Sequence, residues 1–230
     1  MQRRKFTSAT LCAWLVAGPD LARAALPFGF SETDAAAGVR AALERGAVAA
    51  IGQLGRVDGF LGNPKVRIPL PGVLNDAASL LRATGQAKRV DALVVAMNRA
   101  AEAAVPEARN LLVSTVKNLS VEDARQLVTG GDGSVTRFFA DKTRLPLGER
   151  FLPIVTRATQ RVALAERYNA VAGRVAAFGL MRSEDASVER YVTEKALDGL
   201  YLMIGEEEHR IRQDPVGTGS AILRRVFGGR

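Results

Sequence analysis

Apolar residues recur every three or four positions along most of the chain, a spacing that predicts amphipathic helices. Ser31 and Asp34 open the first of these helices much as a capping box does. Its apolar face is formed by Val39, Leu43, Ala47, Ala50, Ile51 and Leu54. Further helical patterns cover residues 72–84, 87–118 with Pro106 as a kink or break, 120–129 capped by Ser120, 134–142, 147–178 and 185–213.

Short polar turns, TGQ, TGGDGS and GLMRS, separate several of these patterns. No stretch of the sequence reads as a run of alternating strands, and no repeat period is present. The sequence therefore predicts an all-α fold, a single-domain bundle of about seven to nine helices.

One segment interrupts the helical patterns. Residues 55–72, GRVDGFLGNPKVRIPLPG, contain three prolines and four glycines among well-spaced apolar residues. Pro69 and Pro71 lack amide hydrogens and disfavour helical geometry in the residues that precede them. We expect an extended Pro-rich segment whose apolar side chains plug a groove in the bundle, namely Phe60, Leu61, Ile68 and Leu70.

The first 24 residues have the pattern of a secretory signal peptide: basic MQRRKF, apolar TSATLCAWLVAG and the cleavage motif ARA at 22–24. The apolar run is much shorter than the ~20 residues that a membrane span needs. We expect cleavage after Ala24, so that residues 25–230 form an all-helical domain that is periplasmic or secreted and meets the membrane only during export. RRKF at 3–6 resembles a twin-arginine signal, but a plain basic leader has the same letters, so both export routes remain open.

Cleavage would remove four basic residues and one acidic residue, so the formal net charge would fall from +8 to +5. Basic and acidic residues are interleaved in the remainder, without the concentrated basic stripe that nucleic-acid binding requires, and no nucleic-acid partner is expected. The sole cysteine, Cys12, would leave with the leader, which removes disulfides and thiol catalysis. ILRRVFGGR at the C-terminus predicts a final helix that docks Ile222, Leu223, Val226 and Phe227 on the core in preference to a membrane surface.

Four strings of residues point to a known family. DGFLGNPKVRIPLP, MNRAAEAAVPEA, RFLPIVTRAT and YVTEKALDGLYLMIGEEEHRIRQDP occur in this order. Together the strings closely resemble an uncharacterised bacterial family, number four-one-nine-seven in the domain-of-unknown-function series, over about residues 31–228. The resemblance implies an exported all-α protein, often with a signal or lipoprotein leader, and no established activity. It implies no catalytic residues, because none are assigned in the family.

The only histidine lies in IGEEEHRIRQDP, where Glu206 and His209 have the Glu-x-x-His spacing of di-iron helical bundles. A helical wheel places both residues opposite the apolar face formed by Val192, Leu200 and neighbouring residues. A di-iron bundle also needs a second such pair, which one histidine cannot supply. We therefore expect a solvated pair and no metal or cofactor.

Glu207 lies near the middle of the same apolar face, where a carboxylate is costly unless it is paired or hydrogen-bonded. The best candidate partners are Arg67 in VRIPLP and Arg99 in MNRAAE. As a structural feature, the ion pair would fix how the extended segment docks. As a functional one, it would be a polar centre in an apolar cleft for the head group of a ligand. The structural interpretation is favoured.

Two further patterns bear on function. TEKALD places Glu194 and Asp198 one helical turn apart beside Lys195, which favours an ordinary salt-bridged face and offers a surface for a partner. STVK, from Ser114 to Lys117, matches the S-x-x-K of serine penicillin-recognising enzymes, but the companion motifs S-D-N and K-T-G are missing.

These observations favour a non-catalytic binding or interaction module of the cell envelope. It would hold an apolar small molecule or a partner helix in the groove beside VRIPLP or on the surface around TEKALD. The first alternative is a hydrolase or transferase that uses carboxylates around Glu102, Glu194 and Glu207. The second is a structural subunit of an envelope complex, which would expose a large apolar patch on the isolated chain.

Overall fold

The computed structural model describes residues 32–177, 182, 185 and 187–214. These residues contain no strand, and the predicted all-α class is confirmed. The helices are α1 (Glu32–Leu54), α2 (Gly72–Leu81), α3 (Ala87–Ala104), α4 (Ala108–Lys117), α5 (Val121–Thr129), α6 (Ser134–Thr159), α7 (Ala163–Ala177) and α8 (Val188–Gln213). No loop separates α2, α3 and α4, which meet at a reversing kink (Arg82–Gln86) and a 3-10 turn (Val105–Glu107). The described residues therefore form six separate helical stretches along the chain, slightly fewer than predicted.

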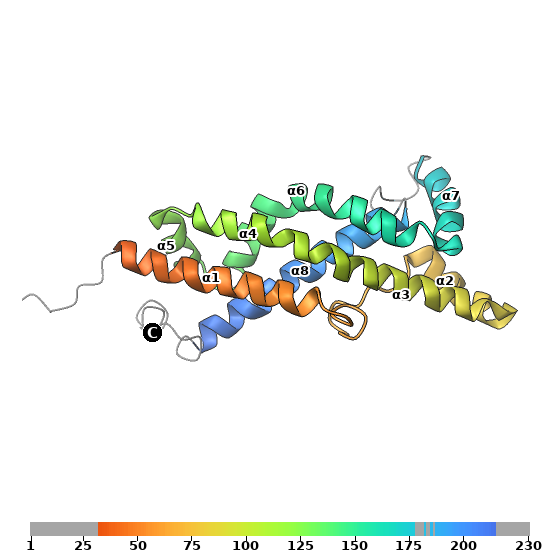
Figure 1. Cartoon of the computed structure of the whole chain (residues 1–230), viewed down its shortest axis with the longest axis horizontal. Helices are drawn as coiled ribbons and strands as arrows, with labels where there is room; N and C mark the ends of the chain where they lie inside the picture. The colour runs from red at the N-terminus through yellow and green to blue at the C-terminus, as the bar shows by residue number, and fades with distance from the viewer. Residues whose placement is uncertain (1–31, 178–181, 183–184, 186, 215–230) are drawn as a thin grey trace, which may run out of the picture.

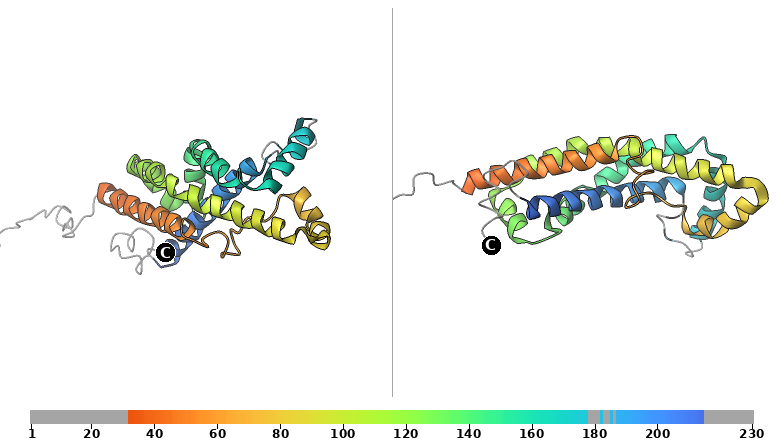
Figure 2. Two further views of the ribbon diagram at one scale, coloured as in Figure 1. Left: turned by 45° about the vertical axis from the view of Figure 1, so that its right-hand side comes forward. Right: turned by 90° about the horizontal axis from the view of Figure 1, so that it is seen from below.

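Helix α8 is the central element of the bundle and packs against α6, α1 and α3 (Figure 1). Its predicted apolar face is buried, with Val192, Ala196 and Leu200 fully enclosed. Helices α2 and α7 lie at one end of the elongated bundle. At the opposite end, α5 lies beside the beginning of α1 and the end of α8 (Figure 2).

Helix α6 corrects two predicted boundaries. The predicted helices 134–142 and 147–178 are in fact α6, which runs through Pro146 and Pro153, and α7, which begins after a turn at 160–162. One face of α6 buries a side chain every four residues, namely Val135, Phe139, Thr143, Leu147, Phe151, Val155 and Thr159. The packing of this face against α3 and α8 outweighs the hydrogen bonds that the prolines remove.

A predicted helix cap and a predicted turn are confirmed, although α2 ends at Leu81 and not at residue 84 as predicted. Ser120 caps α5 in a reciprocal capping box with Asp123, and the hydrogen bonds from the Ser120 hydroxyl and backbone N–H lower the pKa of Asp123. The TGQ turn reverses the chain between α2 and α3, where Gly85 has a φ of 79°, a conformation that favours glycine.

The Pro-rich segment between α1 and α2 packs into the bundle as predicted, but only residues 67–71 are extended, because residues 56–66 form successive hydrogen-bonded turns. Phe60, Ile68 and Leu70 are buried, whereas Leu61 is half-buried. The ring of Phe60 lies directly on the backbone of α8, because a Cβ placed at Gly199 would be 2.7 Å from Phe60 Cε1. The segment is therefore part of the core.

The predicted signal peptide, the Ser31 cap and the predicted helix around 222–227 lie outside the described residues. Of the helices that the structure describes, none is both long and apolar enough to cross a membrane.

Candidate functional site

The polar side chains of α3 hold the Pro-rich segment in place. Glu102 is buried, and its Oε1 accepts hydrogen bonds from the backbone N–H groups of Phe60 and Leu61 at 3.0 and 3.1 Å. Arg99 donates to Glu102 Oε2 at 2.6 Å and to Asp58 Oδ1 at 2.8 Å. The hydrogen bonds with Glu102 and Asp58 raise the pKa of Arg99. Arg99 and Glu102, both predicted site residues, are thus engaged in holding this segment.

Asn98, which the sequence analysis did not single out, completes this set. Its side chain is fully buried and bonds to the backbone of Ile68 through both its oxygen and its nitrogen. The sequence carries a signal for it, because Asn98 and Glu102 are one turn apart beside the buried residues Met97 and Ala101.

Glu207 is buried as predicted, but the predicted partners are wrong. Its carboxylate accepts a hydrogen bond from Gln53 Nε2 at 3.0 Å and pairs with Arg210 Nη2, also at 3.0 Å. Arg99 is occupied by Glu102 and Asp58, and Arg67 is exposed and forms no ion pair within the described part of the chain. The physical reason is that Glu207 faces Gln53 and Gly46 of α1, whereas the Pro-rich segment contacts a different face of α8, at Gly199, Met203 and Glu206.

A small cavity of about 190 Å³ adjoins Glu207 between α1 and α8. Its lining residues are Ala42, Arg45, Gly46, Ala49, Glu207 and Ile211, so Glu207 is the only carboxylate among them.

The other two carboxylates of the enzyme hypothesis have partners of their own. Glu102 is bonded to the Pro-rich segment and Glu194 to Arg144, so the structure does not bring the three together.

The TEKALD surface is an ion-pair network centred on α6. Arg144 Nη2 lies 2.7 Å from both Glu194 Oε2 and Asp198 Oδ1, and its guanidinium stands over the ring of Tyr201. Burial lowers the pKa of Arg144, but the hydrogen bonds to Asp198 and Glu194 outweigh it and leave the pKa raised. Lys195 lies 3.4 Å from Asp198. The predicted salt-bridged face is present, with an arginine that the sequence analysis did not foresee.

Glu206 and His209 do not face the core. Glu206 pairs with Lys65 at 2.6 Å, and His209, which is exposed, contacts Asp132 and Gln213. Within the described residues, no group of three or more His, Cys, Asp or Glu side chains is placed to hold a metal ion.

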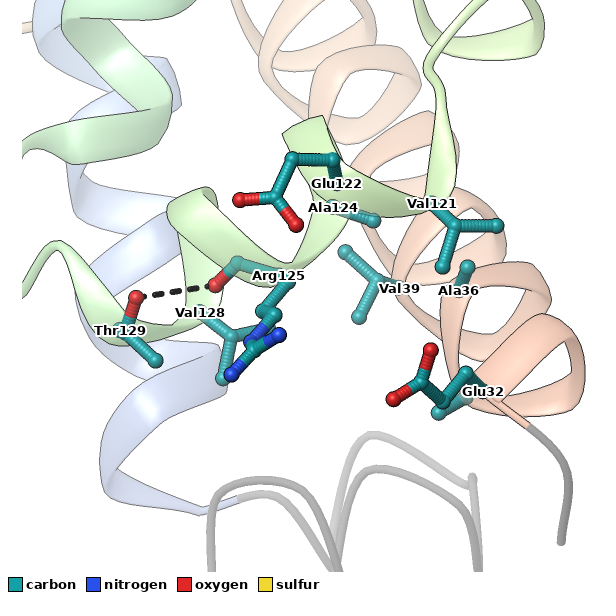
Figure 3. Close-up of a pocket in the computed structure, with 10 residues that line it drawn as sticks. Glu32, Ala36, Val39, Val121, Glu122, Ala124, Arg125, Val128 and Thr129 are labelled. Carbon is teal, nitrogen blue, oxygen red and sulfur yellow. Dashed lines mark hydrogen bonds between the residues drawn. The ribbon is translucent and has the colours of Figure 1, made fainter.

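An open apolar groove lies between α1 and α5, at the end of the bundle opposite α2 and α7. Its volume is about 250 Å³. Its apolar walls are formed by Ala35, Ala36 and Val39 of α1 and by Val121, Ala124 and Val128 of α5. Glu32, Glu122, Arg125 and Thr129 surround the opening (Figure 3). We call this feature the α1/α5 groove.

The comparisons with known proteins identify the family. The model of the family described as "Protein of unknown function (DUF4197)" matches residues 29–228, which include both walls of the groove and the whole Pro-rich segment. The chain belongs to the DUF4197 family. No curated protein and no solved structure matches it.

This DUF4197 chain also contains a polar pair that the sequence analysis missed, formed by the buried Glu208 and the half-buried Arg212. Glu208 accepts hydrogen bonds from the backbone N–H groups of Val135 and Thr136 at the beginning of α6. Arg212 bonds to Glu208 and donates to two carbonyls at the end of α5, those of Leu127 and Val128. One residue thus caps the N-terminus of α6 and the other the C-terminus of α5. The i,i+4 spacing of the pair was the signal available in the sequence.

Proposed function

We propose that this chain is a non-catalytic binding module of the cell envelope that holds an apolar small molecule in the α1/α5 groove. The observation that carries the proposal is the groove itself, where six apolar side chains from two helices surround an open space of about 250 Å³. Concave sites with apolar walls and a few polar groups at the rim are typical of small-molecule sites.

The rim indicates the chemical class of the ligand. Glu32 and Glu122 are exposed carboxylates at the opening, with Arg125 as the one cationic side chain among the lining residues. Two carboxylates against one guanidinium favour a ligand that carries a positive charge beside its apolar part. The location in the envelope rests on the predicted signal peptide.

The proposed site therefore lies away from the two surfaces that the sequence suggested. The apolar residues beside VRIPLP are buried, and the carboxylates of TEKALD are paired with Arg144. The proposal includes no reaction, because Glu102, Glu194 and Glu207 are each held by separate partners.

The test uses the fluorescence of N-phenylnaphthylamine, a neutral apolar dye, with octylammonium and octanoate as competitors of equal chain length and opposite charge. We expect saturable dye binding and stronger competition by octylammonium. Thr129→Trp fills the opening from an exposed position and should weaken dye binding about tenfold, which corresponds to ~1.4 kcal/mol.

Thr84→Trp is the matched control, because Thr84 is also an exposed threonine and lies at the other end of the bundle, outside the groove. Equal dye binding by both variants and the wild type would rule out the groove as the site. Native against denaturing mass spectrometry on protein recovered from its own cell envelope then identifies the natural ligand as a mass that is lost on denaturation.

A further inference from the structure

The end of α8 lies at the edge of the α1/α5 groove. Arg212 donates hydrogen bonds to the carbonyls of Leu127 at 2.8 Å and Val128 at 3.2 Å. Val128 is a wall residue of the groove (Figure 3). The described residues end at Asp214, two positions after Arg212. The described chain therefore ends two residues after a side chain that bonds to a wall residue of the groove.

The sequence of residues 215–230, PVGTGSAILRRVFGGR, matches the groove in chemistry. In a helix of ~100° per residue, its apolar residues Ile222, Leu223, Val226 and Phe227 fall within an arc of ~140°. The polar remainder of the turn carries Arg224 and Arg225, which complement the carboxylates at the rim. The linker PVGTGS at 215–220 spans up to ~20 Å when extended, which is ample for a site that begins beside α8.

We propose that the C-terminal segment of this chain, residues 221–230, docks as an amphipathic helix in the α1/α5 groove and competes with the ligand for it. The apolar residues of the segment lie on the walls formed by α1 and α5, and its arginines lie at the rim with Glu32 and Glu122. The competition rests on the proposed function, whereas the docking itself does not.

The docking is tested by disulfide trapping in the full chain. Cys12→Ser removes the only native thiol, and Thr129→Cys with Val226→Cys places one thiol at the groove and one on the apolar face of the segment. We expect a disulfide within one molecule, formed about tenfold faster than in either of two control pairs, because docking raises the effective concentration of the thiols.

The first control pair, Thr129→Cys with Gly228→Cys, uses the opposite face of the segment. The second, Ser79→Cys with Val226→Cys, uses an exposed position on α2 at the other end of the bundle. Equal rates in all three pairs would overturn the docking. A disulfide that joins two molecules would overturn it as well, since the groove would then hold the segment of a second copy.

The competition is tested with the same dye. Val226→Asp removes the central apolar contact of the segment, and we expect the affinity for N-phenylnaphthylamine to rise about fivefold or more as the groove becomes free. Val216→Asp, in the linker, is the control and should leave the affinity unchanged. A faster disulfide together with no dye binding in any variant would sustain the docking and reject the proposed function. Dye binding that Val226→Asp leaves unchanged would reject the competition alone.

Discussion

The side chain of Asn98 bonds to both polar backbone groups of Ile68. Asn98 Oδ1 accepts from the Ile68 N–H at 2.8 Å, and Asn98 Nδ2 donates to the Ile68 carbonyl at 3.0 Å. These are the two bonds that a neighbouring β-strand would provide. A single side chain on a helix therefore satisfies an extended segment inside an all-helical core, where water is excluded.

Asn98→Ala should destabilise the protein by about 3 kcal/mol, because it leaves a buried N–H and a buried carbonyl of Ile68 without partners. Urea unfolding monitored by circular dichroism measures the loss. Asn110→Ala, at an exposed position of α4, is the control and should change the free energy of unfolding by less than about 0.5 kcal/mol. Equal stability of the two variants would contradict the buried role of Asn98.

Gly199→Ala should destabilise the protein by about 1–3 kcal/mol, because its Cβ would be 2.7 Å from the buried ring of Phe60. Gly52→Ala is the matched helical control. No atom lies within 4 Å of a Cβ at Gly52, so the greater helix propensity of alanine should stabilise α1 by about 0.5–1 kcal/mol. In a Phe60→Leu background, Gly199→Ala should lower the free energy of unfolding by less than it does in the wild type. A double-mutant cycle measures this difference.

Arg210→Ala should lower the free energy of unfolding by about 1 kcal/mol, because it leaves the buried carboxylate of Glu207 with Gln53 as its partner. The cost is moderate since the Arg210 side chain is 60% exposed. Arg67→Ala, in contrast, should leave stability within about 0.5 kcal/mol of the wild type. Thermal melts of both variants distinguish Arg210, the observed partner of Glu207, from Arg67, the partner predicted from the sequence. Equal losses of stability in the two variants would refute Arg210 as the partner.

All three tyrosines should resist ionisation in the folded protein. Burial raises the pKa of Tyr168, raises that of Tyr191 to about 12, and raises that of Tyr201 against the opposing hydrogen bond with Thr143. A folded-state pKa above the unfolded value of ~10 gives stability that is fully present below pH 10 and lost as the pH rises through the folded pKa.

Absorbance at 295 nm measures this directly. The native protein should show less phenolate at pH 10 than the protein in urea, where all three side chains titrate near pH 10. Tyr191→Phe should remove the step near pH 12. One tyrosine titrating at pH 10 without loss of helical structure would show that its burial is incomplete.

Much of the fold could be predicted because the spacing of apolar residues records which face of a helix is buried. The buried faces of α1 and α8 and the burial of Glu207 follow from that spacing. The burial of Phe60 and Ile68 was predicted instead from their apolar side chains in a non-helical segment. The predicted break before Pro146 is absent from α6, because Phe139, Thr143 and Leu147 continue the four-residue repeat of buried side chains past the proline. In this helix the repeat was a better guide than the proline.

The partners of the buried polar groups could not be predicted in the same way. A helical wheel shows that Glu207 is buried but not which helix it faces, and its partner Gln53 is 154 residues away in the chain. The α1/α5 groove likewise depends on how far apart two packed helices lie, which the pattern of either helix alone does not contain. Ser120 was predictable because its partner, Asp123, is only three residues away.

The caps that Glu208 and Arg212 provide have a consequence for the order in which the chain can fold. Arg212 is made 84 residues after Val128, whose carbonyl it binds. A ribosome adds residues from the N-terminus onward, so α5 and α6 emerge well before the side chains that complete their junction. A nascent chain that stops short of α8 therefore leaves the apolar faces of α1, α3 and α6 uncovered, and the native bundle forms only after α8 has been synthesised.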